Sequence, residues 1–196
     1  MQEIQKRVHF GFARAARRLG TIGRHYRVID LRSPLSNPLG RPYLCFDQNS
    51  GFQMVKPRMW ARPMVYLLCD VPCLSIGDFL QIGDRFYFVV EIESYRPPLC
   101  VACNSAIAIS GMRGAPHRYV ENCPASITLT GKGEDQRSGM PGSVPAGSYL
   151  LHLPVLPGFS LMPYMHVTDA SGASYVVESV EISQNGTRAI LSVLQI

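Results

Sequence analysis

The sequence predicts a mainly β protein with an N-terminal helix and two small antiparallel β-barrel or sandwich domains. Segments rich in β-branched and aromatic residues recur along most of the chain, as is typical of strands. The 196 residues include 15 Pro and 17 Gly, and only 17% of them are charged. Many turns between short strands explain this composition, and helical periodicity is confined to the first twenty residues.

The chain is long enough for two small hydrophobic cores. We expect a basic amphipathic helical arm at residues 1–20, a first β domain at 21–112, a linker at 113–118 and a second β-barrel-like domain at 119–196. The boundary is placed at the segment GMRGAPHR (111–118), which has a linker's composition. The segments 83–94 and 172–181 resemble one another, as two hairpin-built barrels would require, although unrelated hairpins would look equally alike.

The arm is predicted to be a helix over residues 2–19. Its apolar residues recur at steps of three and four and share one face: Ile4, Val8, Phe12, Ala15, Ala16 and Leu19. Gly20 is a natural C-terminal stop, and Arg17 and Arg18 suit the negative end of the helix dipole.

Strands are expected in the segments whose alternation or β-branched content favours them: 25–31, 64–70, 85–93, 100–110, 125–130, 148–155, 164–168, 174–183 and 187–195. Turns are expected at Asn49–Gly51 and at Asn185-Gly186, which is the strongest hairpin signal in the chain. The segment 131–147 contains five Gly and two Pro, so we expect a long exposed loop.

Positive charge is concentrated at the start of the chain. Residues 1–38 contain eight Lys or Arg and two Asp or Glu, which leaves eleven basic and twelve acidic residues for the rest. The whole chain carries a formal charge of +5. The pattern is that of a cationic arm attached to a nearly neutral body.

The arm admits three interpretations: a solvated helix, a contact with nucleic acid or a membrane surface, or a helix that docks on another protein. A membrane anchor would need bulkier apolar residues than a face that is half Ala. Contact with DNA is compatible with the charge. The small, flat face favours protein docking, for which the candidate residues are Val8, Phe12, Arg14, Ala15, Ala16, Arg17, Arg18 and Leu19.

Cys69, Cys73, Cys100 and Cys103 are the only metal-like constellation. Structural zinc needs four thiolate or imidazole ligands, which paired Cys on tight knuckles supply. The segment 100–103 lacks a knuckle Gly, and residues three apart on a strand face opposite sides. We therefore interpret these residues as small buried thiols and expect no bound metal.

The motifs of common enzyme classes are missing from the sequence. It contains no G-x-S-x-G elbow, no H-E-x-x-H pair and no phosphate-binding Gly-Lys-Ser/Thr loop. The five histidines are scattered without partner spacing: His9, His25, His117, His152 and His166. We expect a protein that is not an enzyme and that uses no cofactor and no small-molecule substrate.

Several blocks, read in order, resemble a family of virion structural proteins from short-tailed bacteriophages and related prophages. The blocks are GFARAARRLG (11–20), YRV (26–28), SPLSNPL (33–39), GDFL (77–80), RPPLCVACN (96–104), CPASITLTGKG (123–133) and LPVLPG (153–158). The segment from Pro157 to Leu194 also looks like the small β-barrel of head-completion and tail-joining proteins.

This resemblance implies a virion protein of the tail or neck, present in several symmetric copies, that links tail components or anchors fibres. The partners would be other tail or neck proteins and copies of the chain itself. No apolar run is long enough to span a bilayer, and the first residues lack a signal peptide's apolar stretch, so we expect host cytoplasm before assembly. The alternatives are a head–tail connector whose basic arm contacts the genome and a zinc-stabilised module or zinc enzyme.

Overall fold

The computed structural model describes residues 2–47, 63–111, 118–129 and 148–194. It confirms a mainly β protein with one N-terminal helix, whose predicted bounds are correct. The elements are α1 (Gln2–Leu19), β1 (Thr21–Ile22), β2 (Arg24–Tyr26), β3 (Pro38–Gly40), β4 (Tyr43–Asp47), β5 (Met64–Cys69), β6 (Phe79–Ile82), β7 (Arg85–Glu91), β8 (Leu99–Ala102), β9 (Ser105–Ser110), β10 (Arg118–Leu129), β11 (Tyr149–Leu153), β12 (His166–Asp169), β13 (Ser174–Ser183) and β14 (Gly186–Val193).

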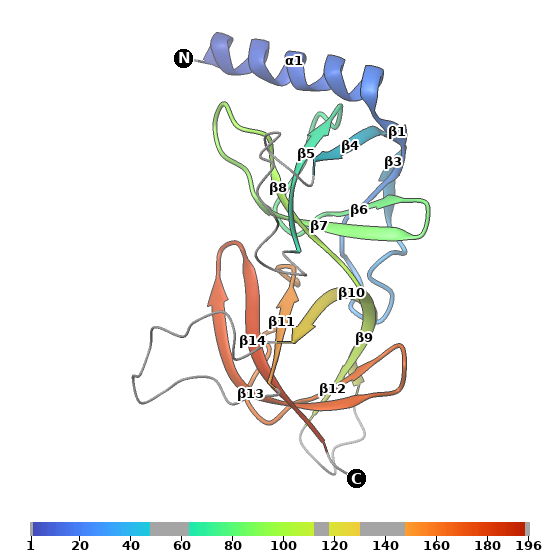
Figure 1. Ribbon diagram of the computed structural model, residues 1–196, viewed down its shortest axis with the longest axis vertical. Coiled ribbons are helices and arrows are strands. Elements are labelled where there is room, and N and C mark those ends of the chain that lie inside the picture. The colour runs from blue at the N-terminus through green and yellow to red at the C-terminus, as the bar shows by residue number, and fades with distance from the viewer. Residues whose placement is uncertain (1, 48–62, 112–117, 130–147, 195–196) are drawn as a thin grey trace, which may run out of the picture.

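The strands form two lobes, which lie one above the other in Figure 1. The sheet lobe is a curled eight-stranded antiparallel sheet in the order β1-β4-β5-β8-β7-β6-β2-β3. The barrel lobe is closed, in the order β10-β11-β14-β13-β12-β9. Helix α1 lies across the end of the sheet lobe that is farthest from the barrel lobe (Figure 1).

The central strands of the sheet lobe bury both of their faces. Phe88 and Val90 on β7 pack in a core that continues into the barrel interior, where Leu151 and Leu191 are fully buried. The alternate residues of β7 pack in a second core between the strands of the sheet lobe. Because the first core contains residues from both lobes, the lobes share buried apolar surface and are joined by more than a linker.

The change from one lobe to the other occurs earlier in the chain than the sequence predicts. The expected strand 100–110 is two strands in two different sheets, because β8 pairs with β5 and β7 whereas β9 pairs with β10 and β12. The side chain of Asn104 marks the transition: its Nδ2 donates to the Ile127 carbonyl oxygen at 2.6 Å, and its Oδ1 accepts from the Ile127 amide at 2.9 Å. The expected first domain 21–112 is therefore wrong in including β9.

The expected strand 25–31 is also shorter in the structure. Strand β2 ends at Tyr26, and just beyond it the Arg27 amide still donates to the Asn37 carbonyl oxygen, next to the Tyr26–Pro38 pair of β2 and β3. The chain then crosses to the barrel lobe, where the Leu31 carbonyl oxygen accepts from the Glu121 amide at 3.1 Å. Leu31 packs on the shared core.

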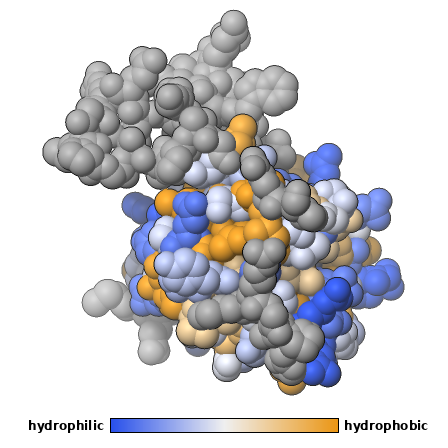
Figure 2. Space-filling model, turned by 90° about the horizontal axis from the view of Figure 1, so that it is seen from below, coloured by the Kyte–Doolittle hydropathy of each residue, from blue (hydrophilic) through white to orange (hydrophobic). Residues whose placement is uncertain are grey.

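The hairpin predicted at Asn185-Gly186 is present, with Ser183 paired to Gly186 across the turn. Gly186 begins β14 with φ +139°, and a side chain there would meet the Leu153 carbonyl oxygen. The turn 49–51, most of the linker 113–118 and the loop 131–147 lie outside the described residues. Seen from below, apolar side chains gather at the middle of the exposed end of the barrel lobe, with hydrophilic residues toward its rim (Figure 2).

Candidate docking surface

The C-terminal end of α1 is fixed to the sheet lobe. Arg17 Nε donates to Asp70 Oδ2 at 2.9 Å, and Oδ1 of the same carboxylate accepts from the Tyr43 amide at 2.8 Å. Gly20 follows at a point of close approach, since a methyl group there would lie 2.6 Å from the Leu44 carbonyl oxygen. These contacts hold the last turn of α1 on β4 and on the end of β5.

The face of α1 that the sequence marked for docking lies toward the chain's own sheet. Ala16 is fully buried, and Val8, Phe12 and Ala15 are half-buried, on a helix that packs against β4 and β5. The expectation that this face is free for a partner is therefore wrong for its central residues.

The remaining residues of the predicted docking set divide into three groups. Arg17, a candidate for docking, is already paired with the chain's own Asp70. Arg14 and Arg18 are exposed, and neither forms an ion pair with another described residue. Leu19 is 73% exposed because the helix ends there, beyond the edge of the packed face.

The outward side of α1 carries a different set of residues. Arg7, Phe10, Arg14 and Arg18 follow one another at steps of three, four and four, and all four are exposed. Residues with this spacing share one helical face. We call these four residues the outer ridge. The side chain of Phe10 is 69% exposed at its centre, and Arg7 pairs with exposed Glu3 at 3.1 Å. The spacing of the outer ridge can be read from the sequence, but the prediction was based on the apolar face of the helix instead.

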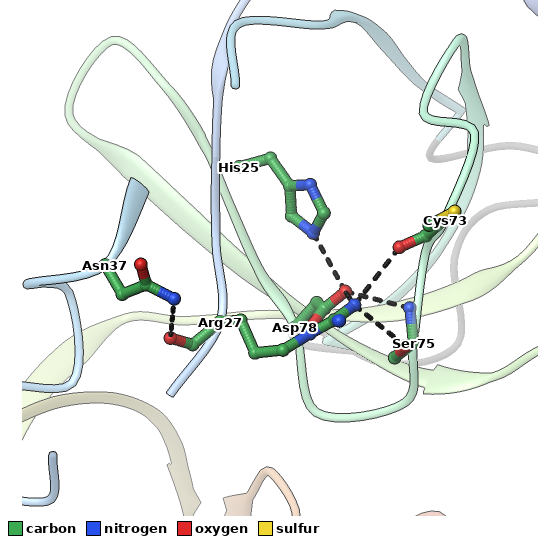
Figure 3. A network of polar contacts seen from close by, with 6 residues as sticks. All are labelled: His25, Arg27, Asn37, Cys73, Ser75 and Asp78. Atoms are coloured by element: carbon green, nitrogen blue, oxygen red, sulfur yellow. Dashed lines mark hydrogen bonds and ion pairs between the residues drawn. The ribbon is translucent and has the colours of Figure 1, made fainter. Parts of the chain in front are cut away.

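A buried polar network ties β2 and the residue after it to the loop before β6 (Figure 3). The Asp78 carboxylate, 2% exposed, accepts from His25 Nε2, from Arg27 Nε and Nη2 and from the Ser75 amide, each at 2.8 Å. Burial opposes ionisation of Asp78, but the hydrogen bonds from Arg27 and His25 outweigh it and lower the pKa of the carboxyl group. The carboxylate is fully used within the fold.

Ser75, His25 and Asp78 are the residue types of a nucleophilic triad, but their connections differ from those of one. In a triad, the serine hydroxyl bonds to the imidazole, which can then remove its proton. Here Ser75 Oγ accepts from Arg27 Nη2 at 2.8 Å, and the imidazole bonds to Asp78. The geometry is that of a structural ion-pair network.

Cys100 and Cys123 are fully buried, and burial raises the pKa of the Cys100 thiol well above its ordinary value and that of Cys123 to about 12. Cys73 is exposed. The part of the chain that the structure describes contains no group of three or more His, Cys, Asp or Glu side chains placed to hold a metal ion. The four cysteines that suggested zinc are not such a group.

A groove of about 750 Å³ lies at the junction of the lobes. Asp84 and Phe86 line it from the β6–β7 hairpin, and Asp169 lines it from the β12–β13 turn. Both hairpins project to the same side of the molecule (Figure 1). The aromatic rings of Tyr149 and Tyr175 also line the groove, edge to face at 5.2 Å. Its described lining contains two carboxylates and no Lys, Arg or His.

A second cavity of about 310 Å³ also lies between the lobes and is lined by His152 and Arg188. Among the described residues, His152 Nδ1 is buried without a hydrogen-bond partner, as is Oγ of Ser126, which lies opposite His152 on β10. Burial, together with the nearby positive charge of Arg188, lowers the pKa of His152 to about 4. The imidazole is therefore neutral at physiological pH.

Within the described residues, α1 falls short of the apolar length that crossing a membrane requires. Comparison of the chain with protein-family models, with curated proteins and with solved structures gives no match. The function is therefore inferred from the chain's own residues and from the resemblance of its sequence blocks.

Proposed function

We propose that this chain is a non-enzymatic structural protein of a tailed bacteriophage, built into the tail or neck and docked there through α1. The resemblance of the sequence blocks supports the virion assignment. The observation that carries the docking role is the outer ridge, because it places three arginines and an exposed Phe on a helix whose last turn is fixed to the body.

The two lobes suit a spacer or an attachment point for fibres. Their shared core contains fully buried residues from both, including Phe88 of the sheet lobe and Leu151 of the barrel lobe. A load applied to one lobe would pass to the other through close-packed side chains. In this proposal the chain stays in the host cytoplasm until it joins the particle.

The assignment is tested on wild-type particles. Particles purified on a density gradient should contain the chain at a fixed ratio to the major capsid protein, measured by quantitative mass spectrometry. A chain that is left in the lysate and absent from the particles contradicts the proposal.

The docking role is tested with Arg14→Glu combined with Arg18→Glu, which reverses charge on the outer ridge and leaves the packed face of α1 intact. This design is sharper than deletion of residues 1–20, because deletion would also uncover β4 and β5. Incorporation should fall at least about tenfold, as expected for reversed charges at an interface. Exposed Arg118, on β10 of the barrel lobe, provides the matched control as Arg118→Glu. Equal incorporation of both variants contradicts docking through the ridge.

A second candidate function is contact with the genome, and the arginines of the outer ridge favour it. Contacts with phosphates release counterions, so affinity for duplex DNA should fall steeply with salt. Fluorescence anisotropy with a short duplex, measured for the wild-type chain and for the Arg14→Glu, Arg18→Glu variant, tests this alternative. An affinity that changes with neither the salt concentration nor the substitutions counts against contact with the genome.

A further inference from the structure

We propose that the outer ridge of α1 docks in the groove between the two lobes of a neighbouring copy, so that the chain assembles head to tail. This inference rests on the proposed function and names the partner of its docking helix: a second copy of the same chain.

The charges of the two surfaces are complementary. The outer ridge presents Arg7, Arg14 and Arg18, whereas the described lining of the groove presents Asp84 and Asp169 and no basic residue. Opposite potentials on two surfaces of one molecule favour association between copies and suppress other orientations.

The carboxylate of Asp169 is fixed in place and negatively charged. Its Oδ1 accepts hydrogen bonds from the Ser171 amide at 2.8 Å and from Ser171 Oγ at 2.6 Å. Its Oδ2 accepts a hydrogen bond from the Tyr175 hydroxyl at 3.3 Å. Asp84 is exposed in the turn of the facing hairpin. An arginine that enters the groove would therefore find a carboxylate on each side. Asp169 is held by hydrogen bonds, whereas the exposed Asp84 can adjust its position.

The apolar parts of the surfaces also match. Phe10, at the centre of the ridge, is 69% exposed, and the groove offers the rings of Phe86 and Tyr149. Aromatic side chains in well-packed pockets are typical anchors of interfaces, and the groove's 750 Å³ lies within the usual range of binding pockets, about 300–1,000 Å³.

The position of α1 excludes docking within one molecule. The helix lies at the far end of the sheet lobe, held by Arg17, Asp70 and the close approach at Gly20, whereas the groove lies beside the barrel lobe. The contact must then join different surfaces of two copies. Contacts of this kind form a closed ring when the rotation closes and a helical filament when it does not.

The test uses two full-length variants. The ridge variant combines Arg14→Glu and Arg18→Glu, and the groove variant is Asp84→Arg. Light scattering coupled to size exclusion measures the mass of each protein alone and of an equimolar mixture. Wild-type protein should associate, and each variant alone should associate at least about tenfold more weakly because like charges would meet. The mixture should recover association, since each mutated surface then finds an oppositely charged one.

Salt and a control variant complete the test. Wild-type association should weaken between about 0.15 M and 1 M salt, where the screening length falls from about 8 Å to 3 Å. Arg118→Glu should associate as the wild type does, and circular dichroism checks that every variant is folded. A wild-type monomer at all concentrations, unchanged association of both variants, or a mixture that stays monomeric overturns the proposal. If incorporation into particles still depends on the ridge in that case, the proposed function survives with a different partner.

Discussion

In the sheet lobe the buried carboxylate of Asp78 accepts four hydrogen bonds, whereas in the barrel lobe Ser126 Oγ and His152 Nδ1 are buried with no partner in the described part of the chain. An unpaired buried charge costs several kcal/mol, so the sheet lobe can keep an ion only because Arg27 and His25 surround it. The barrel lobe tolerates its orphan groups because both are neutral, His152 through its lowered pKa. The cost of burying polar groups is thus offset by ion pairing in the sheet lobe and kept small in the barrel lobe because its unpaired groups carry no charge.

The largest effect is expected from breaking the paired network. Asp78→Ala leaves Arg27 and His25 facing each other without the carboxylate, and we expect a loss of about 3–5 kcal/mol in the free energy of unfolding. Urea denaturation at neutral pH measures this loss. Glu93→Ala removes an exposed pair with Arg96 in the same lobe and should cost about 0.5 kcal/mol at most. Similar losses for the two variants would contradict the distinction between buried and exposed pairs.

The second effect is a pH dependence that arises in the barrel lobe. The pKa of His152 is about 4 in the folded chain and about 6.5 in an unfolded one, so the unfolded state binds the proton first as pH falls. Stability contributed by this group is complete above pH 6.5 and is lost progressively towards pH 4, by roughly 2–4 kcal/mol. His152 lines a cavity between the lobes, so we expect acid to loosen their junction.

Urea denaturation at several pH values between about 7 and 4 measures this loss. His152→Leu should flatten the profile over that range, whereas His9→Gln, at an exposed position on α1, should leave it as in the wild type. Parallel profiles for the wild type and His152→Leu would show that the loss arises from other groups.

Local sequence patterns predict well those elements whose structure depends mainly on nearby residues. The apolar spacing and Gly20 predict α1 with its observed bounds. Alternation and β-branched content predict β7 and β13 to within two residues, because their neighbours along the chain are also their partners in hairpins. Elements that depend on local propensity and a short turn are the ones that a single sequence can reveal.

The rest depends on contacts between residues far apart in the sequence. Residues 100–110 read as one strand, and it is pairing with distant strands, β5 and β7 for β8 but β10 and β12 for β9, that divides them between two lobes. The network around Asp78 could not be predicted either, since nothing in the local sequence connects this residue with Arg27, 51 positions earlier. The docking face of α1 was misassigned for the same reason: the pattern shows which face is apolar, but the sheet that covers it is formed by later residues.

The smallest effect is expected from removing the unpaired hydroxyl of Ser126 in the barrel lobe. Ser126→Ala removes a buried hydroxyl that makes no hydrogen bond to any residue the structure describes, so the change should be neutral or stabilising by up to about 1 kcal/mol. Ser183→Ala, in the same lobe, removes a hydroxyl that donates to the Gly186 carbonyl oxygen at 3.1 Å and accepts from the Asn185 amide at 3.2 Å. That loss should cost about 0.5–1.5 kcal/mol. Urea denaturation of both variants at neutral pH gives the comparison. A clear destabilisation by Ser126→Ala would mean that Ser126 Oγ finds a partner in solution, for which His152 Nδ1 across the strand pair is the nearest candidate in register.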